Sequence, residues 1–430
     1  MGKVGEKILV LLVVVILLVI WYFYVTSQKM EPTENEGEET AITLLASKSW
    51  IRDIDRTLFQ EFEEETGIRV KVLLTPDNGY EELVGTCLAG GNREVDMFMF
   101  PMGSVISSMG IKDIALDLSQ ESWVNRLEGW ARRAGSFQGK VLGFCTWGID
   151  FEGILYNKTF FGENGLEVPE TWQGFLDLCD QIRSLGTVPL YESTNSTWHS
   201  TSWVYGLTPL MYQENPDFVE YLNESSQHRL ADLQCFEQGV EQIRQLFAAK
   251  EDGVPKYYVE NGKEDSFQGS FEYLTQRKAV MMFSYSAFAS ELKAYGSQDE
   301  WGMFPVPLLD NQTAVSNGGG MAKFINKHSE HLEECKMLLD FLARDENLER
   351  YYGERTDLVT SAFQNVESVQ ETEATREILE RSAGASITMF IKDVFYVDPN
   401  MYLYLQGFAN GTVSAEEFVR NLDDYRRESF

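Results

Sequence analysis

The sequence has few of the residues that serve catalysis and metal binding. Histidine occurs only four times in 430 residues, and the five cysteines include no Cys-x-x-Cys pair. No Gly-x-Ser-x-Gly, His-Glu-x-x-His or Gly-x-Gly-x-x-Gly motif is present, which removes the usual signatures of hydrolases, zinc peptidases and dinucleotide-binding domains. A disulfide framework, a metal site and a cofactor site are therefore not indicated, and we expect a protein that is not an enzyme.

Basic residues are also scarce. The chain has 36 Lys and Arg against 67 Asp and Glu, which gives a net charge of −31 at pH 7. Such a surface repels phosphate backbones, so we expect no nucleic-acid partner. The acids are spread along the whole chain, which indicates a solvated surface rather than a dedicated cation site.

One long uncharged run stands near the N-terminus. Residues 8–25 are apolar or aromatic and would make ~27 Å of helix, close to the thickness of a bilayer core. Lys3 and Lys7 precede this run and a glutamate-rich stretch follows it, which predicts a cytosolic N-terminus and an extracellular bulk. Residues 1–27 are thus a signal anchor or a cleaved signal peptide, and residues 28–40 a flexible acidic tether.

The rest of the chain alternates between strand and helix patterns. A short apolar run, Ala41 to Ala46, predicts a buried strand, and helical spacing follows up to Gly67, which fits a C-terminal cap. A second strand, a helix to Ala89 and the strand VDMFMF complete a β-α-β-α-β pattern. This pattern favours a parallel sheet with right-handed crossovers, and similar units recur to the end of the chain.

The order of several motifs resembles a known family. FEEETGIRVKV, GGNREVDMFMF, GKVLGF and LYNKTFFGENGLEVPETWQGF stand in the first half, followed by FQGSFEYLTQRKAVMMFSYSAF, DEWGMFPVP and NGGGMAKFIN. Together they resemble the extracellular solute-binding proteins of family 1, the substrate-capturing subunits of ABC importers. The resemblance covers nearly the whole chain after residue 40.

The resemblance implies an α/β, two-lobe periplasmic-binding-protein-like (type II) fold with several crossings of a hinge. Lobe one is expected at residues 41–150 plus 312–360, and lobe two at 151–311 plus 361–430. It also implies capture of a small solute, most often a carbohydrate, on the extracellular face of a bacterial cell membrane. ABC permease subunits would be the partners, and the N-terminal helix would hold the protein at the membrane unless it is cleaved.

A neutral sugar needs flat aromatic surface for its C–H faces and polar groups for its hydroxyls. We looked for such residues where loops leave the expected strands, at the hinge crossing, after the lobe-two strand and in the triple glycine. The segment YESTNSTWHSTSW is expected to be a loop rich in Ser, Thr and Asn that follows a strand. The candidate ligand-binding residues are Trp50, Trp147, Asp150, Glu192, Trp198, Trp203, Tyr285, Asn317 and Gly319. Among them Asp150 is expected to accept a hydrogen bond from a ligand hydroxyl.

Other functions remain open from the sequence alone. A binding module that presents a solute to a membrane receptor would have the same features, and polyamine or metal ligands compete with sugars. Asp150 and Glu192 could form the carboxylate pair of a glycosidase, but the order of the motifs argues against it.

Overall fold

The computed structural model describes residues 40–428, and the segments that it leaves out are 76–79, 90, 92, 104–105, 107–108, 194–196, 260–266, 268, 319, 356–357, 359, 367–371, 383–385 and 389–400. Residues 41–430 form one compact unit. The predicted membrane helix at residues 8–25 and most of the predicted tether lie outside the described residues. Within the described part, no helix is both long enough and apolar enough to span a bilayer.

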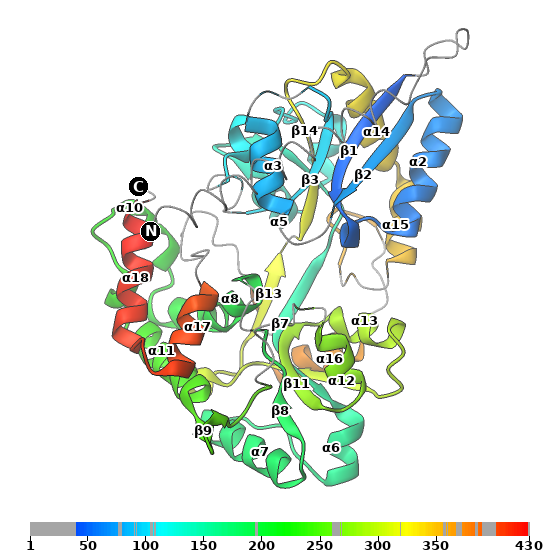
Figure 1. The fold of residues 1–430 in the computed structure, drawn as a ribbon. Helices are drawn as coiled ribbons and strands as arrows, with labels where there is room; N and C mark the ends of the chain where they lie inside the picture. Colours follow the sequence, from blue (N-terminus) through cyan, green and yellow to red (C-terminus); the bar gives the residue numbers. More distant parts are fainter. Residues whose placement is uncertain are drawn as a thin grey trace, which may run out of the picture. The chain divides into compact units, whose positions relative to one another are not determined.

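Lobe one is built around a five-stranded sheet (Figure 1). The strand order is β2 (Arg69–Thr75), β1 (Ala41–Ser47), β3 (Met97–Pro101), β14 (Met321–Ile325) and β6 (Gly143–Cys145). The first three strands are parallel, as the β-α-β-α-β pattern predicted, and β14 runs antiparallel to both of its neighbours. The late strand β14 thus returns from far along the chain to the middle of this sheet.

Alternating side chains of these strands form a core on each face of the sheet. Met97 and Met99 of β3 belong to the core under α2, while Phe98 and Phe100 belong to the core under α3. Gly67 ends α2 in the left-handed conformation that the sequence predicted, with φ of 74°. The helices of lobe one are α2 (Asp53–Thr66), α3 (Tyr80–Ala89), α5 (Gly129–Ala134), α14 (Leu332–Leu342) and α15 (Asp345–Glu354). Its short elements are η1 (Lys48–Trp50), η2 (Ile111–Asp113), η3 (Ser122–Arg126), β4 (Ser136–Phe137) and β5 (Lys140–Val141).

Lobe two is built around a six-stranded sheet whose centre is the long strand β7 (Ile149–Asn157). The strand order is β15 (Ser386–Thr388), β13 (Ala314–Gly318), β7, β11 (Ala279–Tyr285) and β8 (Val188–Leu190), with β12 (Trp301–Phe304) also paired to β7. The strands β11, β12 and β13 all run antiparallel to β7. Their carboxyl ends therefore lie toward the start of β7.

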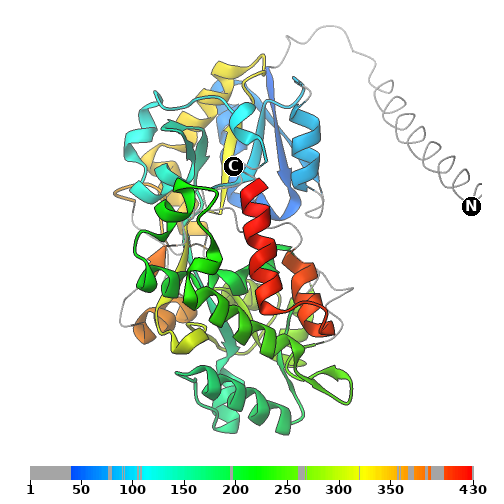
Figure 2. The same ribbon diagram turned by 90° about the vertical axis from the view of Figure 1, so that its left-hand side faces the viewer.

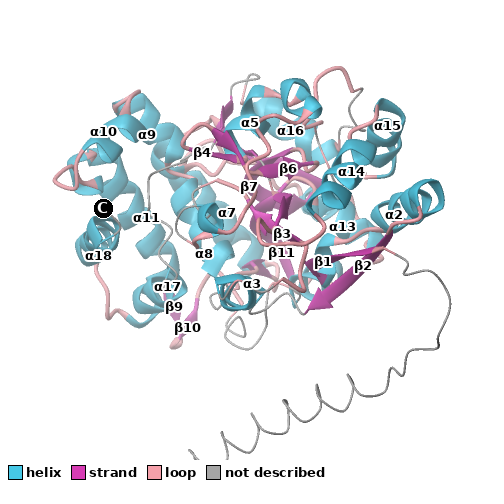
Figure 3. Cartoon of the chain, turned by 90° about the horizontal axis from the view of Figure 1, so that it is seen from above, coloured by secondary structure: helices cyan, strands magenta, loops and turns pink. Residues whose placement is uncertain are grey.

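Helices surround the sheet of lobe two, as Figures 2 and 3 show from two further directions. The two C-terminal helices pack on α11 of this lobe. The helices of lobe two are α6 (Lys158–Asn164), α7 (Trp172–Ser184), α8 (Thr197–Tyr205), α9 (Thr208–Glu214), α10 (Phe218–Glu224), α11 (Gln234–Ala248), α12 (Gly269–Thr275), α13 (Phe288–Ala294), α16 (Glu373–Arg381), α17 (Met401–Asn410) and α18 (Ala415–Glu428). Its short elements are η4 (Leu230–Asp232), η6 (Leu308–Asp310), β9 (Lys250–Glu251) and β10 (Val254–Pro255).

The chain passes between the two sheets at three places, which we call the passages. The first runs from β6 to β7, the second from β13 to β14, and the third from α15 to α16. We expected the second boundary between the lobes at residue 312, before β13. In the structure β13 pairs with β7 in lobe two. The chain therefore reaches lobe one only with β14.

The passages touch one another. A Cβ atom added to Gly148 in the first passage would lie 1.8 Å from the carbonyl oxygen of Thr360 in the third. A Cβ atom added to Gly320 in the second passage would lie 2.5 Å from Cε3 of Trp147 in the first. Only glycine allows the backbone to come so close at these two positions.

Candidate functional site

Several of the candidate residues meet at the start of β7. Asp150 is the register partner of Asn317 in β13, and Tyr285 ends β11 opposite Glu152. Trp147 directly precedes β7 in the first passage. The antiparallel pairing of β11 and β13 with β7 thus brings together residues that are more than 130 positions apart in the sequence. The side chain of Asn317 and the whole of Gly319 lie outside the described residues.

The carboxylate of Asp150 fixes the turn that follows β11. It accepts hydrogen bonds from the hydroxyl of Ser286 and from the backbone N–H of Ala287 (3.1 Å) and of Phe151 (2.9 Å). Burial raises the pKa of Asp150 to about 7, although these hydrogen bonds oppose the shift. The sequence proposed Asp150 as an acceptor for a ligand hydroxyl, and the structure shows that its oxygens already hold the segment after Tyr285.

Tyr285 carries an aromatic ring to the same region. Its hydroxyl donates a hydrogen bond to Oε1 of Glu291 in α13 (3.1 Å), and its ring lies nearly parallel to that of Phe267, with 6.1 Å between the centroids. Burial raises the pKa of Tyr285, the negative charges of Glu291 and Asp150 raise it further, and the positive charge of Arg52 from lobe one lowers it. Tyr285 therefore lies where groups from both lobes act on it.

The two candidate tryptophans of lobe one are both half-buried. Trp147 lies under the guanidinium of Arg355, whose central carbon is 4.8 Å from the centroid of the indole ring. Trp50 ends η1, just after β1, and packs edge to face on Tyr80 with 4.7 Å between the ring centroids. Each indole is held on one side by the protein and keeps part of its surface in contact with solvent.

The segment around Glu192 lies elsewhere, inside lobe two. The sequence predicted a loop rich in hydroxyl groups, but residues from Thr197 to Tyr205 form helix α8, so the expectation of a loop was wrong. Trp203 is 0% exposed and belongs to the main core of lobe two. Such a ring offers no surface to a solute in this structure. The side chain of Trp198 lies outside the described residues.

Trp203 joins a buried polar cluster. Its Nε1 donates a hydrogen bond to Oε2 of Glu192 (3.1 Å), and Nδ1 of His199 lies 3.7 Å from the same oxygen. Nε2 of His199 lies 2.8 Å from the carbonyl oxygen of Phe283, so this nitrogen carries the hydrogen. Burial raises the pKa of Glu192 to about 8 and lowers the pKa of His199 to about 4, so both groups are predominantly uncharged near neutral pH.

Neither a metal centre nor a reactive dyad is evident in the part of the chain that the structure describes. No group of three or more His, Cys, Asp or Glu side chains there could hold a metal ion. Asp150 and Glu192, the pair that a glycosidase would need, have different surroundings: Asp150 binds the turn after β11, whereas Glu192 binds Trp203 in the core. Their geometry gives no support to acid–base catalysis by this pair.

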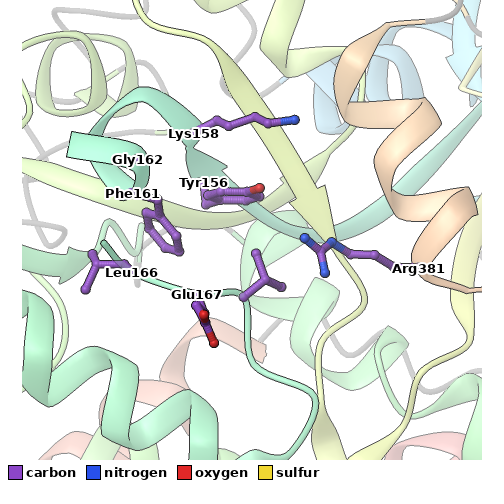
Figure 4. A pocket seen from close by; sticks show the side chains of 8 residues that line it. Tyr156, Lys158, Phe161, Gly162, Leu166, Glu167 and Arg381 are labelled. Carbon is purple, nitrogen blue, oxygen red and sulfur yellow. The ribbon is translucent and has the colours of Figure 1, made fainter. Parts of the chain in front are cut away.

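A cavity of about 380 Å³ lies in lobe two, near the C-terminal end of β7 and thus far from the passages (Figure 4). It opens between α6, the far end of β7 and α16, and its lining residues are Tyr156, Lys158, Phe161, Gly162, Leu166, Glu167, Val168 and Arg381. Both cations of this lining are already bound to acids of α16, Lys158 to Glu373 and Arg381 to Glu377. Glu167 also lines the cavity, and because both cations are paired the lining has no free positive charge to attract an anionic ligand.

Sequence reasoning missed the residues that support the site. Arg355, Ser286 and Glu291 hold Trp147, Asp150 and Tyr285 in place. Ser286 directly follows Tyr285 inside one of the quoted motifs, whereas Glu291 and Arg355 lie outside them. The sequence signal for Arg355 is its place shortly after the Tyr351-Tyr352 pair.

Two α/β lobes that are joined by three adjacent passages, with aromatic rings and polar groups gathered at those passages, define a two-lobe binding protein. A sequence profile described as bacterial extracellular solute-binding protein matches residues 57–378, which is more than half of the chain. The chain therefore belongs to the family of bacterial extracellular solute-binding proteins.

Three similar proteins illustrate this kinship. A multiple sugar-binding protein of Streptococcus mutans is 22% identical over 327 residues, which are 75% of this chain and 76% of that protein. The solute-binding protein RafE in complex with raffinose, a protein known from Streptococcus pneumoniae, superposes with a TM-score of 0.72 at 18% identity and covers 91% of this chain and 99% of its own. A sugar transporter protein of Bacillus licheniformis in complex with stachyose gives a TM-score of 0.66 at 16% identity, with 90% and 100% coverage. At these identities the structural likeness establishes the shared fold.

Proposed function

We propose that the protein captures an oligosaccharide between its two lobes and releases it unchanged. The observation that carries this proposal is the gathering of Trp147, Tyr285 and the Asp150 turn at the passages, where a bound solute would touch both lobes. The relatives named for sugar binding, raffinose and stachyose support a carbohydrate as the solute class. A sensor that presents the same solute to a membrane receptor would use the same site.

The aromatic residues would bind the apolar faces of the sugar. Trp50 and Trp147 from lobe one and Tyr285 from lobe two would each present part of a ring to C–H groups. Asn317 and Gly319, next to the second passage, would supply polar groups for the hydroxyls. Asp150 would act through the turn that it holds rather than by touching the sugar.

Three candidates come from the same sequence segment: Glu192, Trp198 and Trp203. Two of them are too deeply buried to contact a sugar. Glu192 and Trp203 are 1% and 0% exposed, so we assign them to the internal support of lobe two. Trp198 keeps its role as a proposed contact, since it is the second residue of helix α8, away from the buried Trp203 near the helix end.

Binding would favour the closed arrangement of the lobes, because only there can one sugar contact both of them. The closed protein would then dock on permease subunits of an ABC importer. Residues 8–25, if uncleaved, would hold it on the outer face of a bacterial membrane. These last two points rest on the family and on the sequence of the N-terminal segment.

A ligand panel tests the proposal. The full-length chain, purified in mild detergent, is scanned for its melting temperature with raffinose, stachyose, chitin oligosaccharides, polyamines and divalent metal ions. We expect a saturable rise with one class of oligosaccharide and no chemical change in the recovered sugar. A rise with polyamine or metal alone would overturn the choice of sugar, and conversion of the sugar to products would overturn the choice of a binding protein.

A further inference from the structure

We propose that Arg355 is a positioning residue that joins the ring of Trp147 to all three passages and thereby couples this ring to the movement of the lobes. The inference deepens the proposed function, since it names a residue that would never touch the solute and yet would govern how the site closes.

Arg355 is buried behind Trp147. It caps the end of α15, is 2% exposed, and is among the largest side chains that are fully buried in the described part of the chain. Its guanidinium carbon lies 4.8 Å from the centroid of the Trp147 ring and 5.4 Å from that of Tyr351. A guanidinium that has lost its water gains from contact with aromatic faces, so these contacts help to offset its burial.

The same guanidinium is also linked to the first passage through the side-chain hydroxyl of Thr146. Nη1 of Arg355 donates a hydrogen bond to the hydroxyl of Tyr351 (2.5 Å), which also accepts one from the hydroxyl of Thr146 (3.3 Å). Thr146 is the residue before Trp147 and is itself buried. Arg355 therefore contacts the first passage twice, once through the indole ring and once through Tyr351.

The other two passages meet at the same place. Gly320 of the second passage lies against the Trp147 ring, and Gly148, next to Trp147, lies against Thr360 of the third passage. Arg355 itself stands at the start of the third passage, directly after α15. Every passage thus has a direct contact with Trp147, its neighbour Gly148 or Arg355.

A buried ion pair of lobe one lies beside Tyr351. Lys323 of β14 binds Asp55 of α2 (3.1 Å), both side chains being 2% exposed, and its Nζ lies 5.9 Å from the centroid of Tyr351. Asp55 also accepts a hydrogen bond from the backbone N–H of Arg52 at the start of α2. The position of Tyr351, and with it that of Arg355, is therefore set by the rigid elements of lobe one.

Hydrogen exchange on the full-length chain without any sugar tests the proposal. Arg355→Lys keeps the charge but removes the planar group that contacts two rings and a hydroxyl at once. We expect amide exchange to rise by about tenfold in all three passages, at residues 146–148, 318–321 and 358–363, while the β-sheet cores keep their protection. Trp147→Leu is expected to produce the same three-segment pattern, and the double variant to add little to either single one.

Arg344→Lys is the matched control. The guanidinium of Arg344 lies 4.8 Å from the ring of Phe341, the same distance, but at the exposed turn between α14 and α15. We expect this variant to leave the exchange of the passages unchanged. The proposal is overturned if Arg355→Lys accelerates exchange only at the end of α15, or if Arg344→Lys loosens the passages equally. Because no sugar is present, this result is independent of the ligand panel, and a failure of the panel would overturn the proposed function alone.

Discussion

Two clusters of this molecule contain a tryptophan and an acid, and they differ in where the chain places them. The first, Trp147 with Asp150, lies at the passages, and its indole is half-buried and contacts Arg355. The second, Trp203 with Glu192, lies in the core of lobe two, and its indole is fully buried between Phe247 and Phe283. Composition is alike in the two clusters, while only the first has a surface that a solute can reach.

The difference follows from the secondary structure around each cluster. Trp147 stands between two strands that belong to different sheets, and its half-buried ring packs against the core of lobe one and contacts Arg355 and Gly320. Trp203 stands inside helix α8, whose buried face is covered by α11, α17 and β11. The packing of Trp203 within a helix indicates a structural role, and the half-buried position of Trp147 between two sheets is compatible with the binding role proposed for it.

Removal of the buried indole is expected to have the largest effect. Trp203→Ala would leave a cavity in the core and remove the indole N–H that donates to Glu192, so we expect it to lower the free energy of unfolding by about 3–5 kcal/mol. Trp147→Ala, at a half-buried position, is expected to cost less than half as much. Urea denaturation of both variants checks this, and equal losses would remove the distinction between the clusters.

The contact between passages is expected to be nearly as sensitive. Gly148→Ala would place its Cβ atom against the carbonyl of Thr360, which cannot move without shifting the third passage. We expect a loss of about 1–3 kcal/mol in the free energy of unfolding, as for other overpacked sites. Gly162→Ala is the control, because a Cβ atom there has nothing within 4 Å. A Gly148→Ala variant as stable as Gly162→Ala would contradict the close approach.

Affinity should respond in the opposite order to stability. We expect Trp147→Ala and Tyr285→Ala each to weaken oligosaccharide binding by about 10- to 100-fold, since each removes an aromatic face. Trp203→Phe, which keeps the core filled, is expected to bind the sugar as tightly as the native protein. Calorimetric titration measures this, and a larger loss in Trp203→Phe than in Trp147→Ala would reverse the assignment of the two clusters.

The pH dependence of stability separates the two clusters by the pH at which the loss of stability ends. The pKa of Glu192 is raised to about 8 and that of Asp150 to about 7, so the stability that each protonated acid contributes is complete below about pH 4 and is lost as the pH rises through these values. Glu192→Gln should therefore reduce the loss of unfolding free energy with rising pH up to about pH 8. Asp150→Asn should reduce this loss only up to about pH 7. The slope should change by at most about 1.4 kcal/mol per pH unit in each variant.

Urea denaturation at pH 5, 6, 7 and 8 gives these slopes. His199 acts in the other direction, since its pKa is lowered to about 4 and its contribution is present above about pH 6.5 and lost as the pH falls through 4. The contribution of His199 is the same in the native protein and in Asp150→Asn. The difference between the slopes of these two proteins therefore reports the titration of Asp150. Identical slopes in the native protein and both variants would show that neither acid has a raised pKa.

The sequence allowed the supersecondary pattern to be predicted, but not the direction of individual side chains. It also named Asp150, Tyr285 and Asn317, whose strands the structure pairs at the start of β7, as candidates for a site that stays a prediction. The parallel strands β1, β2 and β3 and the cap at Gly67 follow from local periodicity and glycine chemistry, which are properties of neighbouring residues. The second passage was placed too early because the membership of β13 depends on pairing with β7, more than 150 residues away in the sequence. Such a pairing leaves no local trace.

The prediction of a loop around Trp203 failed for a related reason. Ser200, Thr201 and Ser202 are small enough to be enclosed in a buried helix, so the segment has the composition of a loop and the packing of a core. Arg355 was missed because its importance comes from contacts with residues about 200 positions earlier. Distant contacts of this kind decide which aromatic residue faces a ligand and which one faces the core.

Small-angle X-ray scattering of the full-length chain during a titration with raffinose or stachyose tests solute capture most directly. The account predicts a saturable decrease in the radius of gyration that follows calorimetric binding, that is weakened in Trp147→Ala and retained in Trp203→Phe, with the sugar recovered intact. Binding of the sugar with no decrease in the radius of gyration, or a decrease that persists unchanged in Trp147→Ala, would contradict capture between the lobes at the passages.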